Sequence, residues 1–321
     1  MCYNIVNRSH RASDSSVPWW AFLFIWGNEI MKDPKTIEQQ VQILIDRGLI
    51  VDDIEFAKDF LNQVNYYRFS GYLKLFSTND IFDINTSLED IIEIYNFDCE
   101  LRKILYSYLG YIEVLIKTQL ALNLSLNINS IFYLDKNNFM DEDRFNSLQK
   151  DINDSITRKY SKELFIKHFQ GDYLPIWVLV EIMSFGNISM MYANLIDSNK
   201  DLVCKDYLNT NKAYLKNYLY VLSNLRNSCA HQGRIYGKDF ELAPKLSSKD
   251  KKMLLTNRIN VSNSNHKLFI YIFVMLKLIK DDTLKEKMIN ELKLLFSKYS
   301  NVDIDKIGFV NNWESILNSI K

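Results

Sequence analysis

The apolar residues of this 321-residue chain recur mostly at three- and four-residue steps, which is the period of an amphipathic α-helix. Residues that break helices are few, with four prolines and nine glycines in the whole chain. The pattern therefore predicts an all-α protein. The predicted helices cover residues 37–47, 53–64, 88–124, 141–158, 174–186, 187–196, 214–230, 268–279 and 284–299.

Local signals mark several of these helices. Thr36 and Gln39 form a capping box at the start of the first helix. Ser87 is placed to cap the long helix that begins after it. The segment 174–186 is apolar almost all round, which predicts a buried central helix. Glu181 lies within this segment, and a buried carboxylate needs a partner, for which an arginine is well suited.

The first 30 residues lack helical periodicity and differ from the rest of the chain. Their longest apolar run, residues 17–27, is far shorter than the roughly 20 residues that span a bilayer. No small-residue cleavage site follows it, so we expect neither secretion nor a membrane partner. We expect Met31 to be the natural start, residues 1–30 to be an N-terminal extension, and residues 31–321 to form a single helical domain.

The charges of the chain balance, with 39 Lys and Arg residues against 39 Asp and Glu residues. A neutral total does not indicate a nucleic-acid-binding protein, although a basic cleft can exist on a neutral protein. Four cysteines are scattered without a CxxC pair, which argues against a zinc site and against a disulfide framework. This usage is typical of a reducing cytoplasm, so we expect a cytoplasmic protein that needs no metal or other cofactor.

The segment from Arg226 to His231 (RNSCAH) closes an apolar helical run and is the strongest candidate for chemistry. Imidazole titrates near neutral pH, so His231 can give or take a proton. The permanently charged Arg226 can bind a phosphate through two N–H groups. Asn227 and His231 share one helix face, whereas Arg226 lies about 140° around the helix from His231. The alternative is a structural role, because cations are favoured in the last turn of any helix.

A second candidate is the aromatic segment NYYRFSGY at residues 65–72. Its four aromatic rings and Arg68 are suited to stacking on nucleobases. Such a cluster equally forms a hydrophobic core with one polar rim. On the long helix, Arg102 and Glu113 either belong to an exposed charged face or point into a cleft.

Several segments together resemble the abortive-infection AbiD/AbiF family (Abi-like proteins) of bacterial phage-defence proteins. They occur in the order of the family and extend over nearly everything from Met31 onward. The family belongs to the HEPN superfamily, whose hallmark is Arg, four to six residues, and then His, and Arg226 and His231 fit this spacing with four residues between them. The matching segments are NYYRFSGY, FDCELRKIL, YIEVLIKTQLA, PIWVLVEIMSFGNIS, LRNSCAHQGRIY and IGFVNNW.

The resemblance implies an all-helical HEPN-type bundle, usually a homodimer, with a HEPN core at about residues 88–240 and helical additions at both ends. It implies a metal-independent endoribonuclease that cleaves single-stranded RNA as a toxin in abortive infection or a toxin–antitoxin system. Some relatives are inhibited by a small non-coding RNA from the same locus. One departure is that Gln232 and Gly233 follow His231, where the family often has a second histidine and then Asn or Ser.

The resemblance also assigns roles to individual residues. His231 acts as the general base or acid, Arg226 binds and stabilises the phosphate, and Asn227 orients one of these groups. The candidates to hold Arg226 in place are Glu113 and Glu181. The candidate RNA-binding residues are Arg234, Tyr236, Arg68 and Arg102.

Two other functions stay open on the sequence alone. One is a non-catalytic HEPN protein that binds RNA or serves as a scaffold, which the absence of a second histidine at Gln232 favours. The other is a helical adaptor that binds no RNA. Replacement of His231 separates the endoribonuclease from the non-catalytic RNA-binding protein. The enzyme then loses its activity, while the binding protein keeps its function.

Overall fold

The computed structural model describes residues 33–160, 173–259 and 265–320, and it consists almost entirely of helices. This confirms the predicted all-α class. The predicted N-terminal extension, residues 1–30, and the predicted start at Met31 lie outside the described residues. Within the described part of the chain, no helix combines the length and the apolar character that crossing a membrane requires.

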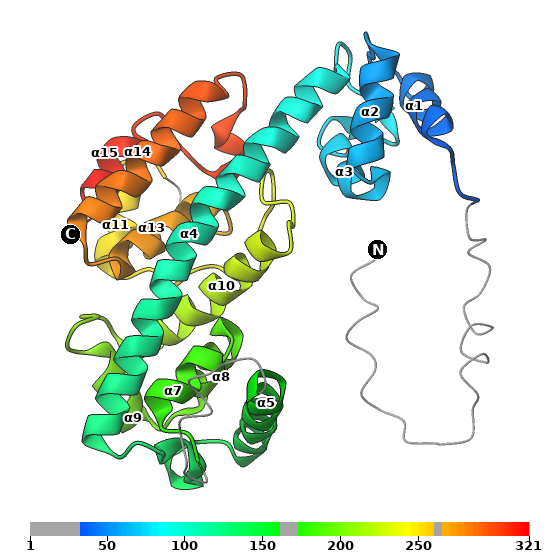
Figure 1. The fold of residues 1–321 in the computed structure, drawn as a ribbon. Coiled ribbons are helices and arrows are strands. Elements are labelled where there is room, and N and C mark those ends of the chain that lie inside the picture. Colours follow the sequence, from blue (N-terminus) through cyan, green and yellow to red (C-terminus); the bar gives the residue numbers. More distant parts are fainter. Residues whose placement is uncertain (1–32, 161–172, 260–264, 321) are drawn as a thin grey trace, which may run out of the picture.

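Three short helices and a small hairpin form one end of the molecule (Figure 1). The predicted capping box is present, because the Gln39 N–H donates to the Thr36 hydroxyl and the Thr36 N–H donates to the Gln39 side chain. Asp53 caps the second helix by accepting a hydrogen bond from the N–H of Phe56, without a reciprocal bond. The elements of this end are α1 (Ile37–Asp46), α2 (Ile54–Gln63), α3 (Tyr66–Leu73), β1 (Ser77–Thr78) and β2 (Ile81–Phe82), with Ser77 opposite Phe82 in the antiparallel pair.

A single long helix, α4 (Leu88–Asn127), runs along the molecule and organises the other elements (Figure 1). Ser87 caps it as predicted, by accepting a hydrogen bond from the N–H of Asp90. Its 40 residues extend over about 60 Å at the usual rise of an α-helix. Helices α3, α7, α9, α10, α13 and α14 all pack on it. Its buried residues therefore lie on more than one face.

Among the described residues, the opposite end of the molecule contains four further helices, and one of the predicted helices has wrong bounds there. The segment 174–186 does not form one helix, because the chain turns at Ser184, whose ψ of 158° is extended. The Ser184 hydroxyl accepts a hydrogen bond from the N–H of Asn187 and so begins a new helix. The elements are α5 (Glu142–Tyr160), α7 (Ile176–Ile182), α8 (Phe185–Asn194) and α9 (Asp197–Cys204), with the 3₁₀ turns η3 (Phe132–Leu134) and η4 (Lys136–Asn138) before α5.

Helix α10 (Lys212–Ala230) packs against both α4 and α8, and a C-terminal group of helices covers another side of α4. Aromatic residues pack together at the C-terminal end. The centre of the Phe309 ring lies 4.8 Å from the centre of the Phe296 ring and 5.4 Å from that of the Trp313 ring. The C-terminal elements are α11 (Ser248–Thr256), α13 (Leu268–Leu278), α14 (Asp282–Lys298), η5 (Ile304–Ile307) and α15 (Trp313–Asn318).

Candidate functional site

The candidate site lies at the C-terminal end of α10. Leu219, Leu222 and Leu225 are fully buried and fix this part of the helix in the core. His231 is the cap residue, and its backbone N–H donates to the carbonyl oxygen of Asn227 at 2.9 Å. The side chains of Asn227 and His231 are exposed on the outer face of the helix end. The helix thus delivers an imidazole and an amide to the surface on a rigid support.

The chain leaves α10 through a Schellman-type turn. Gln232 adopts a left-handed conformation with φ of 57°, and the N–H of Gly233 donates back to the carbonyl oxygen of Ser228 at 2.8 Å. A non-glycine residue in this conformation is strained. The turn is held by Arg68 of α3, which donates to the carbonyl oxygen of Gln232 at 2.5 Å, and by Arg102 of α4, which donates to that of Gly233 at 3.4 Å.

Arg226 lies on another side of α10, where it faces α4. Its Nε is 3.2 Å from a carboxylate oxygen of Glu113, and its guanidinium is 5.8 Å from the centre of the Tyr106 ring. The other oxygen of Glu113 is 3.0 Å from Nζ of Lys117. Of the two candidate carboxylates, Glu113 is the one that contacts Arg226. Because the Arg226 side chain is still 27% exposed, it is anchored on α4 without being withdrawn from solvent.

A fully buried carboxylate fixes the chain beyond the turn. Asp98 of α4 accepts hydrogen bonds from the N–H groups of Ile235 and Tyr236, the latter at 2.8 Å, and from the hydroxyl of Tyr72 at 2.6 Å. It also forms an ion pair with Arg102 one turn further along the helix. Burial raises the pKa of Tyr72 and the Asp98 carboxylate raises it further, so the phenol remains a neutral donor. This network ties α3, α4 and the segment after α10 together.

A pocket of about 650 Å³ lies beside the turn. Asn224 and Ser228 line it from α10, and Arg234 and Lys238 line it from the segment that follows. Burial lowers the pKa of Lys238, and the neighbouring charge of Arg234 lowers it further, against a smaller opposing effect of Glu241. The carboxylates of Asp239 and Glu241 line the same pocket, so its two cations face two acidic side chains.

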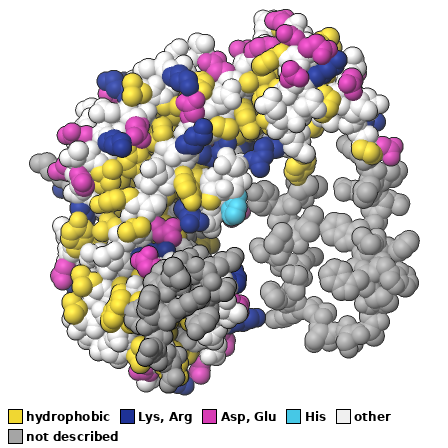
Figure 2. All heavy atoms as spheres, viewed as in Figure 1, with side chains coloured by type: hydrophobic (Ala, Val, Ile, Leu, Met, Phe, Trp, Pro, Cys, Tyr) yellow, Lys and Arg dark blue, Asp and Glu magenta, His cyan; other side chains and the backbone are white. Residues whose placement is uncertain are grey.

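The basic residues of the site belong to one face of the molecule. Figure 2 shows Lys and Arg side chains gathered where the end of α10 meets α3 and α4. Arg68 is exposed although it binds the carbonyl oxygen of Gln232. Arg234 is half-buried and donates to the carbonyl oxygen of Tyr236 at 2.8 Å. The structure thus brings Arg68 and Arg234 to the turn that follows His231, although each already makes a structural contact.

Three of the predicted assignments are wrong. Arg102 is 2% exposed and Tyr236 is 3% exposed, so neither can reach RNA. Arg102 is paired with Asp98, and the Tyr236 hydroxyl donates to the carbonyl oxygen of Asp303. Glu181 is not a buried carboxylate, because it lies on the exposed face of α7, and Arg226 is paired with Glu113 instead.

The aromatic segment 65–72 is divided between core and surface. Phe69 and Tyr72 are buried, as the structural interpretation expects, while Tyr67 is 80% exposed. Of the two alternatives for Arg102 and Glu113, an exposed charged face on α4 is wrong for both, because they are 2% and 8% exposed. Sequence reasoning missed Lys117 as a partner of Glu113, although a spacing of four residues on one helix is a signal for such a pair.

Among residues 33–160, 173–259 and 265–320, no group of three or more His, Cys, Asp or Glu side chains is arranged to hold a metal ion. Fold and site together define a helical protein built on one long helix, with an arginine, an amide and an imidazole at the end of the helix beside it. A family model described as "Abi-like protein" matches residues 59–237, which is more than half of the chain.

The chain therefore belongs to the Abi-like protein family. The matched range begins in α2 and ends just after Tyr236, so it includes Glu113, Arg226, Asn227 and His231, whereas Lys238 of the pocket beside the turn lies outside it. Neither a curated protein nor a solved structure matches the chain. Membership in this family suggests a role in abortive infection, a defence of bacteria against phage.

Proposed function

We propose that this protein is a metal-independent HEPN-type endoribonuclease that cleaves single-stranded RNA in the cytoplasm as the toxin of an abortive-infection or toxin–antitoxin system. The observation that carries the proposal is the end of α10. An exposed imidazole at His231 and a partly exposed guanidinium at Arg226, held by Glu113, lie within six residues of each other. A proton-transfer group and a fixed cation are what the cleavage of a phosphodiester requires.

In the proposed reaction, the 2′-hydroxyl of one nucleotide attacks the adjacent phosphorus, and the bond from phosphorus to the 5′-oxygen of the next nucleotide breaks. A base takes the hydroxyl proton and an acid gives a proton to the leaving oxygen, so the products are a 2′,3′-cyclic phosphate and a 5′-hydroxyl end. His231 supplies one of these two proton transfers, which contributes about 10²- to 10⁴-fold. Arg226 stabilises the charge on the phosphoryl oxygens, and Asn227 orients the imidazole or the phosphate.

We further propose that two copies form the complete site. Arg226 lies about 140° around α10 from His231, so one copy presents the two groups on different sides of the helix. Two large apolar side chains of α4 flank the Glu113–Arg226 pair and are exposed, Tyr106 by 45% and Val114 by 61%. Exposed apolar groups of this size favour a protein contact. A homodimer through this face would let Arg226 of one copy act with His231 of the other.

The second candidate function is a non-catalytic RNA-binding protein or scaffold. The same separation of Arg226 from His231 within one copy favours it, together with Gln232 at the position where the family often has a second histidine. The cations Arg234 and Lys238 then bind RNA without cleavage. A small non-coding RNA is the proposed inhibitor of the toxin, and in this alternative it is simply the bound partner.

The test compares wild type with His231→Ala and, as a matched loss of an imidazole, His266→Ala. His266 does not line the pocket beside the turn, although its Nδ1 lies 2.6 Å from the carbonyl oxygen of Phe240, which does. Each protein is purified, stripped of bound RNA and incubated with total cellular RNA in EDTA. We expect cleavage with cyclic-phosphate ends by wild type and His266→Ala, and none by His231→Ala with unchanged circular dichroism and RNA binding.

Equal cleavage by His231→Ala would show that the imidazole is not the catalyst. RNA binding by stripped wild-type protein without any cleavage would favour the binding protein. The bound RNA recovered before stripping is sequenced, because one dominant structured species identifies the inhibitor or partner. Expression of the same three proteins in cells gives an independent readout, since growth arrest should follow the cleavage activity.

A further inference from the structure

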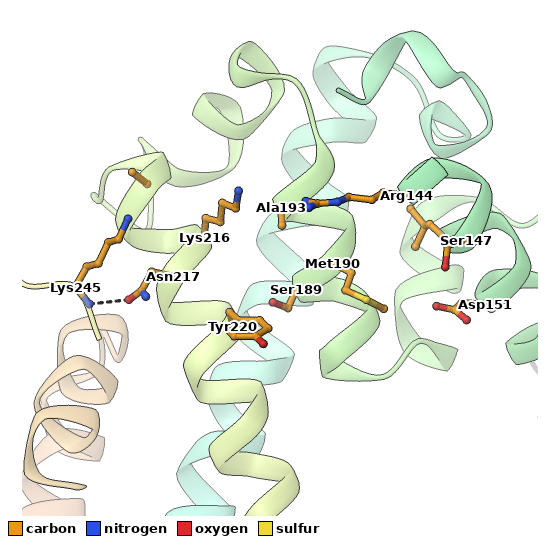
Figure 3. Close-up of a pocket in the computed structure, with 12 residues that line it drawn as sticks. Arg144, Ser147, Asp151, Ser189, Met190, Ala193, Lys216, Asn217, Tyr220 and Lys245 are labelled. Carbon is orange, nitrogen blue, oxygen red and sulfur yellow. Dashed lines mark hydrogen bonds between the residues drawn. The ribbon is translucent and has the colours of Figure 1, made fainter. Parts of the chain in front are cut away.

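A second pocket, also of about 650 Å³, lies between α5, α8 and α10 (Figure 3). It shares Tyr220 with the pocket beside the turn, so the two hollows meet at this residue. Tyr220 is 50% exposed and Met190 of α8 is 51% exposed. These two side chains, called the floor of the pocket below, offer an aromatic ring and a flexible apolar group that are half exposed in the described part of the chain.

Cations surround this floor. Of the described residues that line the pocket, Arg144, Lys216 and Lys245 are positively charged and Asp151 is the one carboxylate. Figure 3 shows Arg144 on one side, with Lys216 and Lys245 on the other and Tyr220 between them. Arg144 is 66% exposed, and its contact with Asp141 is long at 3.9 Å, so its charge remains available. The pocket is therefore apolar at its base and positive at its rim.

The pocket is continuous with the candidate site along one face of α10. Tyr220, Asn224, Asn227 and His231 follow each other at steps of three or four residues and are all exposed. The 11 residue steps from Tyr220 to His231 cover about 16 Å of helix axis, a distance that a few nucleotides of extended RNA can bridge. An amide-lined path thus leads from the imidazole to the aromatic floor.

We propose that the pocket between α5, α8 and α10 binds a nucleotide of single-stranded RNA, a few nucleotides away from the bond that is cleaved. The base stacks on Tyr220, and the neighbouring phosphates contact Arg144, Lys216 and Lys245. Stacking on an aromatic ring accepts every base, so this contact selects single-stranded RNA of sufficient length and not a sequence. This assignment rests on the proposed function, because the position of the bound nucleotide is counted from the phosphodiester bond that the proposed nuclease cleaves.

The experiment measures RNA binding in a His231→Ala background, where the probe is not consumed. The probe is a fluorescein-labelled single-stranded RNA of about 12 nucleotides and mixed sequence, within the usual site size of such grooves. Tyr220→Ala should weaken binding about tenfold, and Tyr220→Phe, which keeps the ring, should restore it. Lys216→Glu should weaken binding and reduce the slope of log Kd against log salt by about 1.

Two exposed residues on other surfaces supply matched controls, Tyr207→Ala and Lys249→Glu. In the cleaving wild-type background, Tyr220→Ala should raise KM about tenfold and change kcat little, because the contact is equal in substrate and transition state. Unchanged RNA affinity in Tyr220→Ala would overturn the pocket assignment while cleavage by wild type still stands. The proposed function fails instead if wild type binds the probe but never cleaves it. In that case a loss of affinity in Tyr220→Ala would still support the pocket assignment.

A change of oligomeric mass in Tyr220→Ala without a change of RNA affinity would also overturn the assignment, since the pocket would then be a contact between copies. Light scattering on each variant records that mass. Binding of a 12-base-pair RNA duplex as tight as that of the single strand would contradict stacking on Tyr220, because paired bases are not free to enter the pocket.

Discussion

Nε of Arg226 lies 3.2 Å from a carboxylate oxygen of Glu113, and this ion pair joins the end of α10 to the long helix α4. The Glu113 side chain is only 11% exposed and has Lys117 at 3.0 Å as a second partner. A partly buried pair with two cations around one carboxylate holds its geometry better than an isolated surface pair. We therefore propose that Glu113 is a positioning residue for Arg226.

The first prediction follows from this contact. Glu113→Gln keeps the size of the side chain but removes its charge, so the guanidinium of Arg226 loses its fixed position. We expect RNA cleavage to fall about 10- to 100-fold, with most of the loss in kcat. Single-turnover cleavage by purified protein measures this effect.

Two controls separate positioning from a general loss of structure. Lys117→Gln removes the other partner of Glu113 and should leave cleavage within a few-fold of wild type. In an Arg226→Ala background, Glu113→Gln should cause no further loss, because the two residues act as a unit. Additive losses in the double variant would contradict the role assigned to Glu113.

The second prediction concerns the buried network of Asp98. Asp98→Asn leaves the guanidinium of Arg102 buried without its counter-ion and turns an amide N–H₂ toward backbone donors. Loss of one partner of a buried pair lowers the free energy of unfolding by about 3–5 kcal/mol. Urea denaturation measures the loss, with the exposed Asp59→Asn as a control. A denaturation midpoint that matches the control would show that the network does not stabilise the fold.

Helix ends were predictable where a side chain signals them locally. Ser87 and Thr36 precede apolar runs, and both cap helices as expected. The break between α7 and α8 was predicted after residue 186 instead of at Ser184, because the run around Ser184 is apolar on both sides and contains no proline there. Helix α11 was missed because its span is hydrophilic, although Ser247 and Asp250 form a capping box at its start. In both cases tertiary packing determines which local signal is used.

The site was predictable as far as it depends on one helix. The neighbouring positions of Asn227 and His231 follow from helical spacing alone. The burial of Arg102 and Tyr236 could not be predicted in the same way. Both contact the buried carboxylate of Asp98, which joins three segments that are separate in the sequence. The type of a residue, whether cationic or aromatic, does not predict whether the folded chain provides such a buried partner for it. The exposure of Glu181 also depends on tertiary packing, because α7 packs on α4 through the face opposite Glu181.

The third prediction compares two glycines with nearly the same left-handed backbone. Gly308 has φ of 86° and Gly48 has φ of 88°, but an added Cβ would lie 2.6 Å from Cβ of Lys267 at Gly308 and would meet nothing within 4 Å at Gly48. Gly48→Ala should therefore cost only the backbone strain of about 1–2 kcal/mol. Gly308→Ala should cost a further 1–3 kcal/mol or so from overpacking. Thermal melting of both variants measures the difference, and equal losses would exclude the clash with Lys267.

The fourth prediction concerns Cys229, which lies inside the RNSCAH segment and faces the core. Burial raises the pKa of its thiol to about 12, so the native protein holds it protonated. An unfolded cysteine titrates near 8.5. Iodoacetamide at pH 8 should therefore leave Cys229 unmodified in the native protein and alkylate it once urea has unfolded the chain, as mass spectrometry of tryptic peptides would show.

The same shift predicts how stability depends on pH. Because the folded pKa of Cys229 is raised, the stability that it contributes is complete below about pH 8.5 and declines as the pH rises toward 12. Between pH 9 and 11, the free energy of unfolding of wild type should fall more steeply than that of Cys229→Ala, by about 1 kcal/mol per pH unit. The variant shares every other titrating group, so the difference in slope reports this thiol alone. Parallel slopes would mean that Cys229 ionises in the folded protein as readily as in the unfolded chain.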